Sequence, residues 1–222
     1  MATLKTVRRI LLVDEHPIVR QGLRALLEQS LEYAIAGEAA NVDDGLAALA
    51  SLRPDAVILD ISLGKDSGLD FIARARRDDT NVAVLVLSML DEMTYAERAL
   101  RVGANGYVMK REATDRLLVA LERVLAGKVY VSPSVSDRLL TTLSKPGDGA
   151  RYPIDRLTDR ELEIFRLVGM GMRAVDMAER LGISQKTIET HRSRIKAKLG
   201  VETAAELVIR ASSWLRDGQL KA

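Results

Sequence analysis

The stretch Ala56-Val57-Ile58-Leu59-Asp60 places a carboxylate directly after four consecutive apolar residues. A short, unbroken apolar run is typical of a strand that is covered on both faces of a parallel sheet. Other runs of strand character lie, within the first 127 residues, at 10–13, 33–37, 82–87 and 106–109. They alternate with segments whose apolar residues recur every three or four positions, at 17–29, 43–52, 68–77, 93–102 and 113–126. This alternation predicts an α/β, doubly wound, five-stranded parallel sheet with helices on both faces.

Polar side chains follow four of these strands: Asp14-Glu15, Asp60, Ser88 and Lys110. Ligands of open parallel sheets bind at the carboxyl ends of the strands, so these side chains are the first candidates for a site. Three carboxylates repel one another unless a cation joins them, and all-oxygen ligands suit Mg²⁺. A carboxylate can also attack phosphorus and form an acyl phosphate. Ser88 and Lys110 would then hold the phosphoryl oxygens.

Composition narrows the class of protein. The sequence has no cysteine, which excludes disulfides, thiolate metal sites and cysteine nucleophiles and is typical of a cytoplasmic protein. The longest aliphatic run, 82–87, is far shorter than the roughly 20 residues of a membrane-spanning helix, and no signal peptide is evident. Residues 1–150 carry two more acidic than basic side chains, whereas 151–222 carry four more basic than acidic. The basic surplus of the C-terminal part permits binding to a polyanion.

The strand and helix pattern ends near residue 127, after which proline and glycine punctuate the chain. We therefore expect a first domain at 1–127 and a linker at 128–154, within which 134–143 could form a short helix. Residues 155–222 show helical patterns without a strand candidate, which predicts a second, small all-α domain.

The second domain carries the pattern of a helix-turn-helix. Thr158 and Glu161 form a capping box at the start of a first helix, and 174–181 is a second. A tight turn with Gly182 then precedes a third helix, which Ser184 caps and which continues to residue 199. Two helices joined by a turn of three or four residues containing glycine are the signature of this motif.

On a helical wheel of the third helix, Ile188, Ile195 and Leu199 share the core side. The opposite side is polar, and basic residues flank it, where phosphates would lie if the helix entered a major groove. A solvated amphipathic helix is the alternative, although residues 184–199 hold five basic side chains and one acidic. The residues that we expect to contact DNA are Lys186, Thr187, Glu189, Thr190, Arg192, Ser193, Arg194, Lys196 and Lys198.

Residues 8–127 resemble the receiver domain of two-component response regulators, a flavodoxin-like fold. The resemblance implies that Asp60 is the phosphoacceptor and that Ser88 and Lys110 are the switch hydroxyl and the phosphate-binding lysine. Tyr107 matches the switch aromatic of the family, or is an ordinary half-buried strand tyrosine. The implied Mg²⁺ ligands are Asp14, Glu15, Asp60 and the backbone carbonyl of Ser62.

Two further features lie close in sequence to the acidic residues. Leu63-Gly64 stands where receivers usually have Met-Pro, which leaves the rigidity of that loop open. His16 follows the acidic pair, and we expect it to serve at the surface or as a helix cap, because a site rich in oxygen does not need it as a ligand.

Residues 155–216 resemble the LuxR-type DNA-binding domain, on the pattern Thr187-Ile188-Glu189, His191 and Ile195 together with further matches before and after it. Receiver plus this domain is the arrangement of the NarL/FixJ family. The resemblance implies that Glu189, Thr190 and Ser193 face the bases. It also implies that the last helix, 203–215, can pair with its twin in a dimer on DNA.

The function that follows is a transcription factor whose DNA binding is controlled by phosphorylation of Asp60, with a sensor histidine kinase and double-stranded DNA as partners. Such a protein is no enzyme beyond accepting and losing its own phosphoryl group. A phosphorylation-independent DNA-binding protein, with the receiver as a dimerisation module, is the alternative. A phosphohydrolase of the haloacid dehalogenase type is disfavoured, because Ser62 stands where its second aspartate is needed.

Overall fold

The computed structural model describes residues 6–78, 81–144 and 153–217. The chain forms two compact units that divide after Leu139, and each is considered by itself. The predicted linker residues 145–152 lie outside the described residues.

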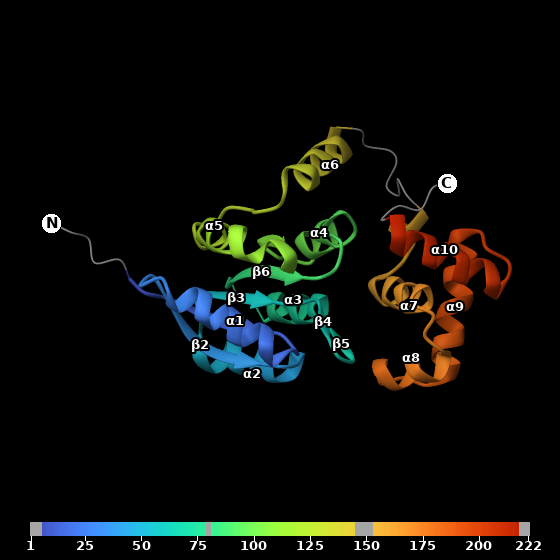
Figure 1. The fold of residues 1–222 in the computed structure, drawn as a ribbon, viewed down its shortest axis with the longest axis horizontal. Coiled ribbons are helices and arrows are strands. Elements are labelled where there is room, and N and C mark those ends of the chain that lie inside the picture. Colours follow the sequence, from blue (N-terminus) through green and yellow to red (C-terminus); the bar gives the residue numbers. More distant parts are fainter. Residues whose placement is uncertain (1–5, 79–80, 145–152, 218–222) are drawn as a thin grey trace. The chain divides into compact units, whose positions relative to one another are not determined.

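The first unit is built on a five-stranded parallel sheet with the strand order β2-β1-β3-β6-β7 (Figure 1). Its strands are β1 (Arg8–Val13), β2 (Tyr33–Ala39), β3 (Ala56–Leu59), β6 (Ala83–Ser88) and β7 (Gly106–Met109). The sheet reverses its winding between β1 and β3, the place where doubly wound sheets open a crevice for a ligand. The predicted fold class is confirmed, and each of the five predicted strands is present.

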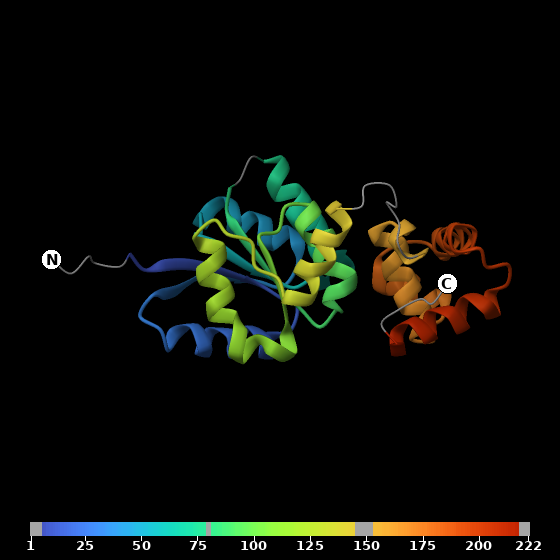
Figure 2. The same cartoon turned by 90° about the horizontal axis from the view of Figure 1, so that it is seen from above.

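Four helices connect these strands and a fifth follows the last strand: α1 (Pro17–Glu28), α2 (Val42–Leu52), α3 (Gly68–Arg77), α4 (Glu92–Arg101) and α5 (Ala113–Leu125). They lie on both faces of the sheet (Figure 2). Leu23 and Leu27 of α1 and Leu117 and Leu121 of α5 join one core with apolar residues of the central strands. The all-aliphatic β3 has no exposed residue, because helices cover both of its faces.

A two-residue hairpin that the sequence analysis did not identify follows Asp60. Its strands are β4 (Ser62–Leu63) and β5 (Asp66–Ser67), paired antiparallel. Gly64, at the position where receivers usually have proline, has φ +65° and so adopts a left-handed conformation that favours glycine. Strand pairing therefore orders this loop without proline.

The start of the predicted linker packs against the first unit. Tyr130 forms backbone hydrogen bonds with Asn105 and Tyr107, so the chain runs beside β7. The helix α6 (Pro133–Ser144) follows, where a short helix was expected. Ser132 donates a hydrogen bond to Glu92 Oε1 at 2.7 Å, and Arg138 donates to the Met93 carbonyl at 2.8 Å. These contacts hold the segment on the N-terminal turn of α4.

The second unit contains α7 (Asp159–Gly169), α8 (Ala174–Leu181), α9 (Gln185–Leu199) and α10 (Ala204–Asp217), preceded by a 3₁₀ turn at Pro153–Arg156. The predicted capping box is present, since Thr158 accepts from the Glu161 N–H and Glu161 accepts from the Thr158 N–H. Gly182 ends α8 in a left-handed conformation, and Ser184 caps α9 as expected. The rings of Phe165 and Trp214, 5.6 Å apart, join α7 to α10.

We predict that Gly68→Ala destabilises the first unit. A Cβ at this position would lie 2.3 Å from the backbone oxygen of Asp60, so the loop that follows the acidic residue would have to move. We expect a loss of about 1–3 kcal/mol in the free energy of unfolding, measured by urea titration.

Gly22→Ala is the matched control, because a Cβ at this exposed position of α1 meets no atom within 4 Å. Alanine should stabilise the helix there by up to about 1 kcal/mol. Equal stabilities for the two variants would contradict the packing that we describe.

Candidate functional site

Asp60 lies at the carboxyl end of β3 with only 3% of its surface exposed. Both oxygens of its carboxylate are engaged: Ser88 Oγ donates to Oδ1 at 2.7 Å, and Lys110 Nζ donates to Oδ2 at 2.6 Å. The donors come from the ends of β6 and β7, the two strands that follow β3 in the sheet. The structure thus brings the three residues together as the sequence predicted.

Lys110 joins two buried carboxylates. Its Nζ lies 2.6 Å from Asp14 Oδ2 and 2.6 Å from Asp60 Oδ2. Burial lowers the pKa of Lys110, but the two carboxylates outweigh burial, so its pKa lies above the ordinary value. The ammonium group therefore stays charged and compensates the two neighbouring anions.

Asp14, His16 and Asp60 each place one possible metal-ligand atom within 4.8 Å of the other two. His16 donates its backbone N–H to Asp14 Oδ1 at 2.9 Å, and its Nδ1 lies 3.1 Å from the same oxygen. It also precedes α1 as the N-cap residue, as expected, but its side chain does not cap the helix. The position of the ring beside Asp14 was not predicted, because the turn after β1 creates it.

Glu15 is partly exposed and is not a member of this group. Its Oε2 lies near Gly64, 3.4 Å from where a Cβ would be. Ser62 lies beside Asp60 and donates its backbone N–H to Oδ1 at 3.2 Å. Two buried carboxylates, a third nearby and a backbone turn supply oxygen atoms of the kind that hard divalent cations bind.

Tyr107 lies in β7 and is fully buried, at 1% exposure, so the alternative of a half-buried strand tyrosine is wrong about its burial. Its hydroxyl donates to the Leu90 carbonyl at 2.8 Å, in the loop between β6 and α4. Burial raises the pKa of Tyr107 well above its ordinary value, which keeps the hydroxyl a donor. The same loop holds Ser88 at one end and Glu92, the partner of Ser132, at the other.

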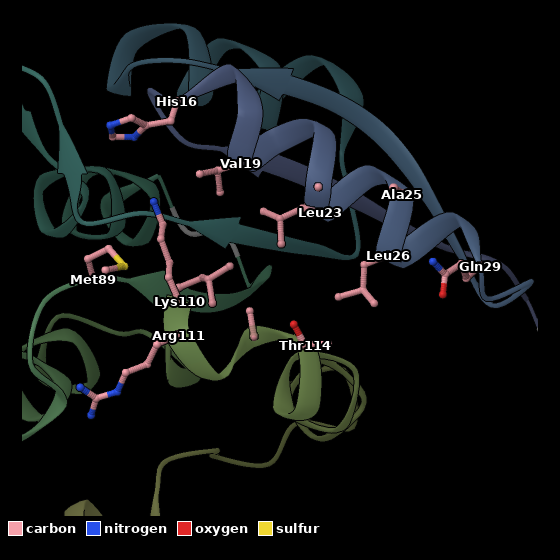
Figure 3. A pocket seen from close by; sticks show the side chains of 13 residues that line it. His16, Val19, Leu23, Ala25, Leu26, Gln29, Met89, Lys110, Arg111 and Thr114 are labelled. Carbon is pink, nitrogen blue, oxygen red and sulfur yellow. The ribbon is translucent and has the colours of Figure 1, made fainter.

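A groove of about 640 Å³ lies beside the acidic residues, between α1 and the start of α5 (Figure 3). Val19, Leu23 and Leu26 of α1 give it an apolar wall. Lys110 and Met89 close the end nearest to Asp60. A partner that fills this groove would therefore approach the acidic residues at the same time.

In the second unit, α9 has the orientation that the helical wheel predicts. Ile188, Ile195 and Leu199 are buried. The opposite face is exposed along its whole length, and its members are Lys186, Glu189, Thr190, Ser193, Arg194 and Ala197. The flanking residues Arg192, Lys196 and Lys198 are partly buried. The polar face is therefore exposed and can enter the major groove of DNA.

The flanking residue Lys198 has a structural partner. Its Nζ donates to Glu161 Oε2 at 2.6 Å, and Glu161 is only 3% exposed. Burial raises the pKa of Glu161, but Lys198 and the Thr158 backbone outweigh it, and the pKa lies below its ordinary value. Lys198 thus ties the end of α9 to the start of α7, which the sequence analysis did not anticipate.

The apolar residues along one side of α10 form a stripe that divides into two parts. Leu207, Ala211 and Trp214 are buried against the domain core. Val208 is 38% exposed and Leu215 is 37% exposed, and Ala204 is exposed as well. Half of the stripe is therefore free to contact another molecule.

Comparison with known proteins identifies both units. Residues 10–122 match the model of the response regulator receiver domain, and residues 155–211 match that of the bacterial regulatory proteins of the luxR family. This chain is a two-component response regulator of the NarL/LuxR family. The match makes it a regulator of transcription and not an enzyme.

Relatives align with this regulator over nearly their whole length. The transcriptional regulatory protein MctR of Rhizobium johnstonii is 38% identical, covering 90% of this chain and 91% of the relative. The transcription regulator BvgA of Bordetella pertussis is 35% identical, covering 90% and 94%. A solved structure of RcsB from Salmonella typhimurium has a TM-score of 0.70 at 28% identity, covering 94% of this chain and 98% of that chain.

Among the described helices of the regulator, none combines the length and apolar character needed to cross a lipid bilayer.

We predict that Lys110→Met destabilises the receiver by about 3 kcal/mol in the presence of a chelator, because it leaves two buried carboxylates without their cation. Urea unfolding at pH 7 measures the change. Lys65→Met removes an equal charge at an exposed position and should have little effect. A similar small effect for both variants would show that Lys110 does not compensate the acidic pair.

Proposed function

We propose that Asp60 accepts a phosphoryl group from a sensor histidine kinase and that this modification controls DNA binding by the second domain. The observation that carries the proposal is the pair of donors on Asp60, Ser88 and Lys110, held at 2.7 and 2.6 Å at the ends of neighbouring strands. The same donors can hold the phosphoryl oxygens once the carboxylate has attacked phosphorus. Tyr107 would follow Ser88 as the switch aromatic.

The Mg²⁺ that we propose for this site would be held by Asp14, Glu15, Asp60 and the Ser62 carbonyl. The ion would supply positive charge to the incoming phosphoryl oxygens. The chain's own residues orient the acceptor: the Ser62 N–H and the Ser88 hydroxyl fix Oδ1, and Lys110 fixes Oδ2. Asp60 is therefore positioned before the phosphodonor arrives.

The donor protein would dock on the groove between α1 and α5. This groove combines an apolar wall with an end at Lys110, so its occupant lies next to Asp60. A phosphorylated histidine of the kinase would reach the acceptor from there, and the P–N bond would break as the P–O bond to Asp60 forms, with the histidine imidazole as the leaving group. A protein that binds both DNA and this donor works in the cytoplasm, so we propose that location for the regulator.

DNA binding is proposed for the exposed face of α9. The unit that carries this face has more basic than acidic side chains, and the residues of the face are polar or small. A relative of similar fold, RcsB from Salmonella enterica, has been solved bound to promoter DNA in the presence of a phosphomimetic; it is 30% identical, with a TM-score of 0.66. The exposed part of α10, with Val208 and Leu215, would join two copies on inverted half-sites.

We propose domain limits of 1–127 for the receiver, 128–154 for the linker and 155–222 for the DNA-binding domain. Residues 128–139 of this linker belong to the first compact unit, through the contacts of Ser132 with Glu92 and of Arg138 with Met93. The linker is therefore in contact with the first turn of α4, which directly follows the loop that contains Leu90. A rearrangement of that loop on phosphorylation would reach the linker directly.

We predict that Asp60→Asn abolishes labelling by a small radioactive phosphodonor in the presence of Mg²⁺, because an amide cannot form the acyl phosphate. The measurement is label on the purified full-length protein that hydroxylamine or alkali releases. Asp78→Asn, which removes an exposed carboxylate at the end of α3, should be labelled like the parent. Labelling of Asp60→Asn at the parent's level would mean that another residue accepts the phosphoryl group.

We predict that two substitutions on α9 act differently on DNA binding. Lys196→Ala removes a flanking cation and should weaken all sequences about equally, lowering the salt slope by roughly one unit. Ser193→Ala, on the exposed face, should change sequence preference instead. Titrations of specific and unrelated DNA at several salt concentrations measure both. An unchanged salt slope for Lys196→Ala would place this residue away from phosphate.

A further inference from the structure

Glu189 is the single acidic side chain of the α9 sequence, and it lies on the exposed face with 57% of its side chain accessible. The proposed function brings this face against a polyanion. A carboxylate in that position is unfavourable unless a hydrogen-bond donor of the DNA meets it, because it would lose its hydration without a partner. Glu189 therefore differs from the surrounding basic residues, whose charge complements that of DNA.

The carboxylate of Glu189 is held by one neighbour. Arg192 NH1 donates to Oε1 at 2.8 Å, and only 19% of the Arg192 side chain is exposed. Oε2 has no hydrogen-bond partner among the residues that the structure describes. The pair contributes little to stability as an exposed i,i+3 contact, but it limits the directions in which the remaining oxygen can accept.

The neighbouring hydroxyl on this face is already engaged. Thr190 Oγ1 donates to the Lys186 carbonyl at 2.9 Å, within the helix. The Thr190 hydroxyl has thus used its proton within the helix and can offer a base edge only a neutral acceptor, whereas Oε2 of Glu189 offers a charged one.

We propose that Glu189, positioned by Arg192, selects a cytosine at one position of each half-site. In the major groove the base-edge donors are the amino groups of cytosine and of adenine, and guanine and thymine present acceptors there. Adenine carries the N7 acceptor beside its amino group, which repels a carboxylate, whereas cytosine presents its amino group alone. This inference rests on the proposed DNA-binding function and adds the chemistry of one base.

The test is selection from random double-stranded DNA by the full-length protein, treated with beryllofluoride and followed by sequencing of the bound fraction. The parent should require cytosine at one position of each half-site, by roughly fivefold or more over the other bases. Glu189→Gln should move that preference to adenine, because an amide matches both the amino group and N7. Arg192→Lys keeps the charge but loses the planar guanidinium, and it should relax the preference for cytosine at the same position.

Glu179→Gln is the matched control, since it removes an equal charge from an exposed position of α8 and should leave every base preference unchanged. Identical base preferences for Glu189→Gln and the parent, or a parent motif without cytosine, would overturn the inference and leave DNA binding intact. Enrichment of no sequence by the parent and by Glu179→Gln would overturn the proposed function itself, and the inference with it.

Discussion

The contact between Lys110 and the two buried carboxylates of Asp14 and Asp60 is the interaction on which the receiver depends. Two anions with side chains 3% exposed are unfavourable next to each other, and the lysine removes that cost with two contacts of 2.6 Å. The strand order brings the three residues together, because β1, β3 and β7 end at the same edge of the sheet. The site is thus a product of topology and charge balance together.

Phosphorylation acts on this balance. A phosphoryl group on Asp60 adds negative charge and new acceptors where Ser88 and Lys110 now contact the carboxylate. Ser88 begins the loop that also contains Leu90, the acceptor of Tyr107, and that leads to Glu92, the acceptor of Ser132. One short loop therefore connects the acceptor, a buried aromatic residue and the start of the linker. Phosphorylation can shift the receiver from one conformation to another if the two conformations differ in these contacts.

Sequence reasoning predicted what local pattern and strand order determine. The aliphatic run before Asp60, the capping box of Thr158 and the core side of α9 each follow from a rule with a definite spacing, and the structure confirms them. It missed what depends on tertiary contacts. The place of the His16 ring, the burial of Tyr107 and the pairing of Lys198 with Glu161 each involve partners that no periodicity reveals. The docking of the linker on α4 belongs to the same class.

The most direct test of the account is the affinity of the full-length protein for one of its binding sites, measured with and without beryllofluoride. A coupling of about 1–3 kcal/mol predicts that the mimic tightens binding by roughly 5- to 150-fold, and that Asp60→Asn removes the gain. Identical affinity and stoichiometry for the treated and untreated protein would contradict the account. The receiver would then be a dimerisation module of a phosphorylation-independent DNA-binding protein.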